Sequence, residues 1–195
     1  MANTAIIDFG AGNMNSVKNA LRYLGVQSTV TSKASEIRNA ERVILPGVGA
    51  FGYMMKNLQK KKLAATIIEA IEQSKPFLGI CLGMQALFEE SEESSGIKGL
   101  SVFQGKVVKF RKGKVPQTGW NLVKPLRQGV VGEGYAYFVN SYYPEPKDSS
   151  IIAATSNYGG EFAAAIQRKN VLAVQFHPEK SGKYGLAILR KWLKC

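Results

Sequence analysis

The stretch Phe77-Leu78-Gly79-Ile80-Cys81-Leu82-Gly83 is the part of the sequence from which the fold can be worked out. Its first four residues predict a short buried strand, and residues 84–87 predict a helix after it. Small residues on both sides of Cys81 let the chain turn sharply and hold that side chain in a strained, exposed position. The helix N-terminus would favour a thiolate there. The arrangement is typical of a nucleophile elbow with Cys in place of Ser. The alternative is a buried structural cysteine.

The rest of the first half repeats this alternation of short apolar strands and helices. Residues 5–7, 27–31 and 43–45 are expected to be strands, the last one stopped by Pro46-Gly47. Apolar residues at helical spacing predict helices over residues 17–24 and 63–74, and Gly25 fits the position just past the first of them. Short, wholly apolar strands separated by helices predict an α/β fold with a mostly parallel sheet covered on both faces.

The second half is richer in strands. They are expected at residues 102–110, 135–139, 151–155, 162–167 and 171–176, and a closing helix at 183–193. The acidic run 89–93 is expected to be an exposed helix end and turn, and Gly113, Gly119, Gly129 and Gly132 are expected to be turns. No repeat or linker interrupts the pattern, so residues 1–195 are predicted to form a single domain.

Composition limits the classes of protein to consider. Of the 195 residues, 45% are hydrophobic and 21% are charged, as in a soluble globular protein. No apolar run approaches the roughly 18 residues of a membrane span, and residues 1–4 lack the basic region of a signal peptide. Because the two cysteines, Cys81 and Cys195, form no disulfide framework, a cytoplasmic protein is expected.

The net charge of +12 is concentrated in one stretch of sequence. No helix-turn-helix, zinc finger or aromatic stacking motif accompanies this charge, which favours a solvated surface or a docking face for an acidic protein over a nucleic-acid site. The basic stretch runs between positions 97 and 127 without an acidic residue and comprises Lys98, Lys106, Lys109, Arg111, Lys112, Lys114, Lys124 and Arg127.

A lone histidine is the second chemical signal. A thiol nucleophile normally needs an imidazole partner, and His177 is the only histidine of the chain. It follows the predicted strand that ends at Phe176, and ligands of open α/β sheets gather at the carboxyl ends of strands. Pro178 fixes the turn, and Glu179 can orient the imidazole by accepting its hydrogen bond. A structural histidine and a surface carboxylate are the alternatives, but the combination favours a Cys81–His177–Glu179 triad.

A third signal is Pro46-Gly47-Val48-Gly49, again at a strand end. Glycines on both sides of Val48 let its N–H point at a developing oxyanion, and the N–H of Leu82 would be the second donor. A plain strand-to-helix turn also explains these glycines. Other sites are not predicted: Asn15 stands where a dinucleotide fingerprint needs a third glycine, and one histidine with two distant cysteines does not make a metal site.

These segments, in this order, resemble class I glutamine amidotransferases, and within them the glutaminase subunits of imidazole glycerol phosphate synthases. The resemblance covers essentially the whole chain. It rests on the segments Gly12-Asn13, Asn15-Ser16-Val17, Leu45-Pro46-Gly47-Val48-Gly49, Gly79-Ile80-Cys81-Leu82-Gly83-Met84-Gln85, Gly119-Trp120-Asn121, Tyr137-Phe138-Val139 and Gln175-Phe176-His177-Pro178-Glu179-Lys180-Ser181-Gly182.

The resemblance implies a flavodoxin-like, mostly parallel sheet with added strands in the second half. It implies that Cys81 attacks the side-chain amide of L-glutamine, forms a thioester and releases ammonia, with no cofactor. The resemblance places Gly49, Gln85, Ser141 and Tyr142 around the substrate. Ammonia would pass to a (β/α)₈-barrel synthase subunit that makes imidazole glycerol phosphate in histidine biosynthesis. That subunit would dock against Asn13, Trp120, Tyr137 and Lys180.

Two positions depart from the family pattern, because Gln117 and Asn140 stand where many members have His. They leave the triad untouched and open the alternative of a paralogous synthase as partner. A stand-alone cysteine hydrolase acting on γ-glutamyl or peptide bonds is a second alternative. A basic nucleic-acid-binding protein with a structural Cys81 is a third.

Overall fold

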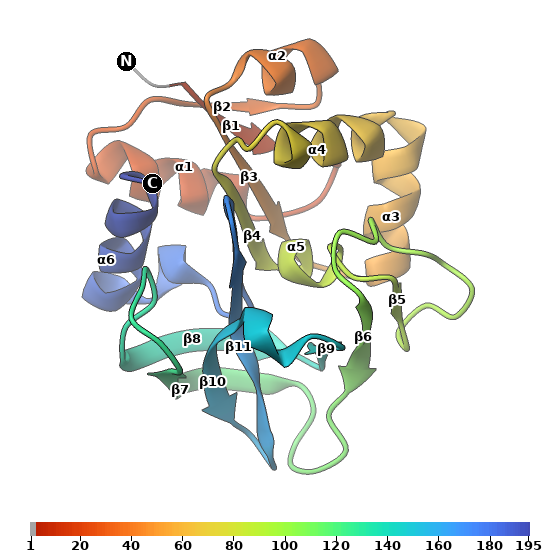
Figure 1. Cartoon of the computed structure of the whole chain (residues 1–195), viewed down its shortest axis with the longest axis vertical. Helices are drawn as coiled ribbons and strands as arrows, with labels where there is room; N and C mark the ends of the chain where they lie inside the picture. The colour runs from red at the N-terminus through yellow and green to blue at the C-terminus, as the bar shows by residue number, and fades with distance from the viewer. Residues whose placement is uncertain (1–2) are drawn as a thin grey trace.

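The computed structural model describes residues 3–195, and within them a nine-stranded mixed sheet forms the centre of the fold (Figure 1). One half of this sheet is parallel, and its strand order corresponds to the 2-1-3-4-5 order of flavodoxin-like folds. In spatial order these strands are β2 (Ser28–Thr31), β1 (Thr4–Ile7), β3 (Arg42–Gly47), β4 (Phe77–Cys81) and β12 (Val171–Val174). The flavodoxin-like prediction is confirmed.

The other half of the sheet is antiparallel, as the strand-rich second half of the sequence predicts. It continues from β12 with β11 (Glu161–Arg168), β10 (Ile152–Asn157), β7 (Gln117–Pro125) and the edge strand β8 (Gly134–Asn140). A separate three-stranded sheet contains β5 (Glu90–Ser91), β6 (Gly105–Lys109) and β9 (Tyr142–Pro146). The short 3₁₀ helix η1 (Ser149–Ile151) precedes β10.

Helices cover both faces of the parallel strands, which is why the inner strands β4 and β12 are apolar throughout, whereas the edge strand β2 is mostly polar. Alternate residues point to opposite faces: Ile7 packs with one group of helices and Ile6 with the other. The first group is α2 (Ala34–Asn39), α3 (Phe51–Lys60) and α4 (Leu63–Glu72). The second group is α1 (Met14–Tyr23) and α6 (Gly182–Trp192), which lie together on one side of the molecule in Figure 1.

Helix α3 was not predicted, because the signal for its start is not local. Ala50 precedes the helix and provides no side-chain cap. Instead, the Phe51 amide donates to the carboxylate of Glu93 at 2.6 Å, and the Gly52 amide donates to the Ser94 hydroxyl at 3.0 Å. These two residues belong to a segment more than forty positions further along the chain. Only the fold brings the capping groups to the helix.

The expected helix end in the acidic run 89–93 is wrong. This segment contains the short strand β5. Glu90 and Glu92 are exposed, as expected, but the carboxylates of Glu89 and Glu92 also hold other segments. Glu89 accepts a hydrogen bond from the Gly105 amide at 2.8 Å, and Glu92 accepts one from the Lys109 amide at 2.9 Å. The run therefore links α3 to the three-stranded sheet.

Three further boundaries differ from the prediction. Strand β3 continues through Pro46, which pairs with Ile80, because pairing of β3 with β1 already ends at Ile44. Gly119 lies inside β7 and not in a turn, and its φ of 133° is a conformation that only glycine adopts easily. The helix after Cys81 is the single turn α5 (Leu82–Gln85), too short for the expected stabilisation of a thiolate by a helix dipole.

No helix between residues 3 and 195 is long and apolar enough to cross a membrane. Met1 and Ala2, on which part of the expectation about a signal peptide rests, lie outside the described residues.

Candidate active site

Cys81 lies at the point where β4 turns into α5, as the elbow pattern predicts. Its φ is 54° and its ψ is −111°, a strained conformation for a residue with a side chain. The residue is only 6% exposed, so the exposed position expected for its side chain is wrong, because the surrounding core residues cover it. Gly47, at the end of β3, pairs with Cys81, so the loop that begins at Val48 starts beside the cysteine. Two strand ends therefore bring the nucleophile candidate and the oxyanion-loop candidate together.

The glycine two residues after Cys81 is required by packing. A Cβ atom at Gly83 would lie 1.8 Å from the carbonyl oxygen of Leu45, and one at Gly79 would lie 2.9 Å from the carbonyl oxygen of Gly83. The turn of α5 thus rests directly on the backbone of β3 and β4. Any larger residue at position 83 would push Cys81 away from its present place.

His177 and Glu179 form a buried pair. The Nδ1 atom of His177 lies 2.8 Å from Oε1 of Glu179, and the two side chains are 4% and 2% exposed. Ser181 holds this turn: its hydroxyl donates to the His177 carbonyl at 2.6 Å and accepts from the Tyr137 amide at 2.9 Å. The 3₁₀ helix η2 (Pro178–Lys180) is in this way fastened to β8, and the imidazole has little freedom to turn.

Burial lowers the pKa of His177, but hydrogen bonding and charge interactions with Cys81 and Glu179 outweigh burial and raise this pKa from 6.5 to about 10. The imidazole can therefore hold a second proton at neutral pH while it faces a thiolate. Such a ring can take a proton from a thiol and later return it to a leaving group.

A cavity of about 310 Å³ opens above Cys81. It is lined by every residue for which the sequence predicts a catalytic, oxyanion or substrate role, except Glu179, which lies behind His177. These residues are Cys81, His177, Val48, Leu82, Gly49, Gln85, Ser141 and Tyr142. Sequence reasoning gave no site role to Glu93, Pro116 and Val139 on the cavity wall, because their side chains match no catalytic motif, although Val139 lies in a segment that carries the family resemblance.

Gln175 is a further missed residue, which enters the family resemblance only as the first residue of the segment Gln175–Gly182. Its side chain is fully buried, and its Nε2 lies 3.5 Å from the sulfur of Cys81. Its Oε1 accepts a hydrogen bond from Nε2 of Gln85 at 3.0 Å. Its position two residues before His177 in an extended segment is the only sequence signal that could have pointed to it.

The two departures from the family pattern are both buried. Gln117 is 2% exposed and Asn140 is 5% exposed, and they pair directly across β7 and β8. Asn140 donates to the Tyr142 carbonyl at 3.0 Å and lines the cavity. These positions therefore lie beneath the surface of β7 and β8.

The residues predicted to face a partner are exposed or half-buried around the same region. Trp120 is 58% exposed and packs edge-on against Tyr137, with ring centroids 6.1 Å apart. Tyr135, 62% exposed, and Val139, 38% exposed, extend this patch and were not predicted. Lys180 is exposed at the rim of the cavity, and exposed Asn13 caps α1 through a hydrogen bond from the Ser16 amide.

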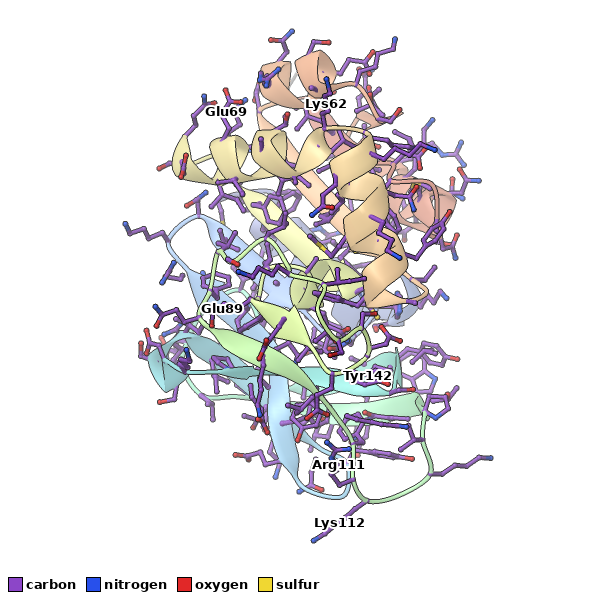
Figure 2. All side chains as sticks on the ribbon, turned by 90° about the vertical axis from the view of Figure 1, so that its right-hand side faces the viewer. Lys62, Glu69, Glu89, Arg111, Lys112 and Tyr142 are labelled. Atoms are coloured by element: carbon purple, nitrogen blue, oxygen red, sulfur yellow. The ribbon has the colours of Figure 1, made fainter. Side chains whose placement is uncertain are left out.

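The basic stretch is entirely at the surface, as predicted: all eight of its lysines and arginines are exposed. Figure 2 shows Lys112 projecting from a loop at one end of the molecule, whereas Lys62 lies toward the other end. Arg111 pairs with Glu92 at 2.8 Å. The positive charge of the protein is thus spread over several surfaces. Among residues 3–195, no group of three or more His, Cys, Asp or Glu residues is arranged to hold a metal ion.

The family model described as "Glutamine amidotransferase class-I" matches residues 5–194. The chain belongs to this family. Its fold is also that of a solved structure described as a glutamine amidotransferase, with a TM-score of 0.80 at 18% identity over 98% of this chain and 97% of the other. The predicted enzyme class, a glutamine amidotransferase, is thus confirmed.

Curated relatives are similar over nearly the whole of this chain. The chain is 47% identical over 199 residues to "Imidazole glycerol phosphate synthase subunit HisH" of Caldanaerobacter subterraneus subsp. tengcongensis, covering 97% of this chain and 98% of the relative. It is 45% identical over 197 residues to "Imidazole glycerol phosphate synthase hisHF, chloroplastic" of Arabidopsis thaliana, covering 96% of this chain but 33% of that longer protein.

Proposed function

We propose that this chain is the glutaminase subunit of an imidazole glycerol phosphate synthase. It hydrolyses L-glutamine to glutamate and ammonia and supplies the ammonia to a (β/α)₈-barrel synthase subunit in histidine biosynthesis. The observation that carries the proposal is the buried His177–Glu179 pair opening on the same cavity as strained Cys81. The similarity to relatives named as subunits of this synthase supports the choice of reaction. We further propose that residues 1–195 act as a single domain in the cytoplasm.

In the first half of the reaction, the Cys81 sulfur attacks the side-chain amide carbon of glutamine. His177 accepts the thiol proton, and Glu179 stabilises the positive charge that the ring then carries. The amide oxygen gains negative charge and is held by the N–H groups of Val48 and Leu82, both on the cavity wall. The carbon–nitrogen bond breaks, the leaving nitrogen takes the proton from His177, and ammonia departs.

In the second half, water attacks the thioester and gives up a proton to His177. The tetrahedral intermediate collapses, the carbon–sulfur bond breaks, and glutamate leaves with Cys81 again a thiolate. Gln85 assists in holding the substrate. Both hydrogens of its Nε2 are taken by Gln175 and the Tyr142 carbonyl, so its Oε1 is the atom left to accept a hydrogen bond from glutamine.

The exposed patch of Trp120, Tyr135, Tyr137 and Val139 supports docking of a synthase partner at the mouth of the cavity. Large exposed apolar groups commonly mark interaction sites, and this patch is continuous with the active site because Val139 also lines the cavity. The Arabidopsis relative adds support, since this chain corresponds to only a third of a protein that carries the synthase name. In our proposal the remaining two thirds of that protein contain the part that corresponds to the synthase partner.

The burial of Gln117 and Asn140 bears on the alternative of a different synthase. Both side chains are buried, and Asn140 faces only the cavity, so neither belongs to the exposed patch proposed for docking. Their departure from the family pattern therefore gives no reason to replace the histidine-pathway synthase by a paralogue.

The proposal is tested by measuring glutamate release from glutamine by the chain alone, with the barrel subunit, and with the barrel subunit plus its synthase ligand. We expect slow hydrolysis by the chain alone and activation in the third mixture. The flanking glycines permit the Val48 peptide to turn its carbonyl toward the cavity in the resting enzyme, and removing one oxyanion donor costs about 10²–10³ in rate. If the three rates agree within a few-fold, a stand-alone hydrolase becomes the better assignment.

A further inference from the structure

Gln175 lies against the proposed nucleophile without any role in the reaction described so far. Its side chain is fully buried between Cys81 and Gln85. Its backbone is fixed by a hydrogen bond from its amide to the Ala164 carbonyl at 2.8 Å. A buried amide is normally kept because its donor and acceptor both have partners. Here one of these partners is a sulfur atom that changes charge during the reaction.

The hydrogen-bond network determines which end of the Gln175 amide faces the sulfur. The Tyr142 carbonyl oxygen can only accept, so the group of Gln85 that lies 3.0 Å from it must be the NH₂. The same NH₂ lies 3.0 Å from Gln175, which must therefore present its oxygen on that side. The NH₂ of Gln175 is then left to face Cys81 at 3.5 Å. Reversing either amide would place two acceptors or two donors together.

We propose that Gln175 is a catalytic residue whose amide donates a hydrogen bond to the Cys81 sulfur and stabilises the thiolate each time it forms. This inference rests on the proposed role of Cys81 as nucleophile. The donor acts twice in one cycle. It stabilises the thiolate that results when His177 takes the thiol proton, and again the thiolate that leaves when water has attacked the thioester. In the neutral thioester the same contact is weaker, because a hydrogen bond to a charged acceptor is about twice as strong as one to a neutral acceptor.

The network also connects the nucleophile with the substrate pocket. The chain of contacts runs from the Tyr142 carbonyl through Gln85 and Gln175 to the sulfur. Tyr142 and Gln85 both line the cavity in which glutamine is proposed to bind. A substrate that shifts Gln85 would therefore also shift the donor on Cys81. This gives the buried amide pair a function that an apolar pair of the same size could not perform.

The test measures the reactivity of the thiol and does not depend on glutamine. Iodoacetamide alkylation of Cys81 is followed against pH in the full chain with Cys195→Ser, because Cys195 is exposed and would also react. Gln175→Met keeps the length of the side chain and removes the donor. We expect alkylation at pH 7 to slow about ten- to hundredfold, the usual effect of losing a hydrogen bond to a charged group. The half-maximal rate should also move to higher pH.

Other titratable groups on the cavity are His177, Glu93, Tyr142 and Lys180, and the substitution leaves all four in place. The matched control is Gln117→Met, which removes another buried amide without a contact to Cys81 and should leave the alkylation profile unchanged. Gln175→Asn, one methylene shorter, is the second variant and should behave like Gln175→Met. Circular dichroism melting shows which variants are folded.

The outcomes separate the two claims. If Cys81 of the parent reacts at pH 7 no faster than a free thiol, the proposed nucleophile is wrong and the inference about Gln175 falls with it. If the parent thiol is activated and the folded Gln175 variants keep the parent profile, only the inference about Gln175 is overturned. A slower, alkaline-shifted profile in a folded Gln175 variant, with an unchanged control, supports it.

Discussion

Glu179→Gln is the substitution whose effect the structure allows us to estimate most directly. It keeps the shape of the side chain and removes its charge. The affected hydrogen bond spans 2.8 Å between two side chains that are 4% and 2% exposed, so water cannot replace the lost interaction. Hydrogen bonds to charged groups contribute roughly 1.5–3 kcal/mol, which corresponds to a fall in kcat of about ten- to hundredfold. This loss should be clearly smaller than that of His177→Ala, because the imidazole itself remains.

The pH dependence gives the same substitution a second, independent signature. Cys81 and Glu179 together overcome the effect of burial and raise the pKa of His177 to about 10. Removing the negative charge of Glu179 lowers this pKa, so the ring loses its second proton at a lower pH. The alkaline limb of the kcat profile, which reports the protonated His177 that releases ammonia, should therefore move toward neutrality.

The assay is glutamate release by the complex with its synthase partner and ligand, measured across pH for the parent, Glu179→Gln and Glu133→Gln. Glu133 is exposed, so its substitution removes the same charge from the chain without touching the site. The reasoning is refuted if Glu179→Gln and Glu133→Gln give the same rates and the same alkaline limb. It is also refuted if Glu179→Gln is as inactive as His177→Ala.

Three further predictions concern the nucleophile, the base and the charged surface. Cys81→Ala should abolish glutamine hydrolysis, and an electrophilic glutamine analogue followed by peptide mass spectrometry should label Cys81 and not exposed Cys195; stoichiometric label on Cys195 alone would contradict the assignment. His177→Ala should be about as damaging as Cys81→Ala, because nucleophile and base act as a unit, and a variant within a few-fold of the parent would require a different base. The basic stretch should show only weak, salt-sensitive binding to random DNA in a mobility-shift titration, and a Kd below about 10⁻⁶ M at physiological salt would mean that nucleic acid is a ligand after all.

The parallel half of the fold could be predicted because its signals are local. The strand ending at Ile7 and the strand before Cys81 are apolar on both faces, and each is next to a helix with one apolar side. Such segments have few other ways to bury their surface. Helix α3 shows the limit of this reasoning, because Glu93, the residue that caps it, is distant in the sequence and becomes its neighbour only after folding.

The candidate site divides in the same way. The residue types of Cys81, His177 and Glu179 and their positions at strand ends could be recognised from the sequence, since each follows an apolar run with a proline or glycine beside it. The sequence did not show that His177 and Glu179 would be deeply buried. It also did not show that the pKa of the imidazole would rise and not fall. Burial lowers that pKa and the partner charges raise it, and the balance depends on how close Cys81 and Glu179 lie to the imidazole in the folded protein.

The sequence by itself determined the five strands of the parallel half and the elbow at Cys81, because these depend on neighbours within a few positions, and it limited the possible base to the single histidine His177. The tertiary structure alone decided what surrounds the sulfur. Gln175 contacts Cys81 across ninety-four positions of sequence, and Gln85 contacts Gln175 across ninety. No spacing rule connects residues so far apart. Strands β4 and β12 are neighbours in the sheet, and this pairing brings their carboxyl ends, and the amide that follows β12, to the same cavity.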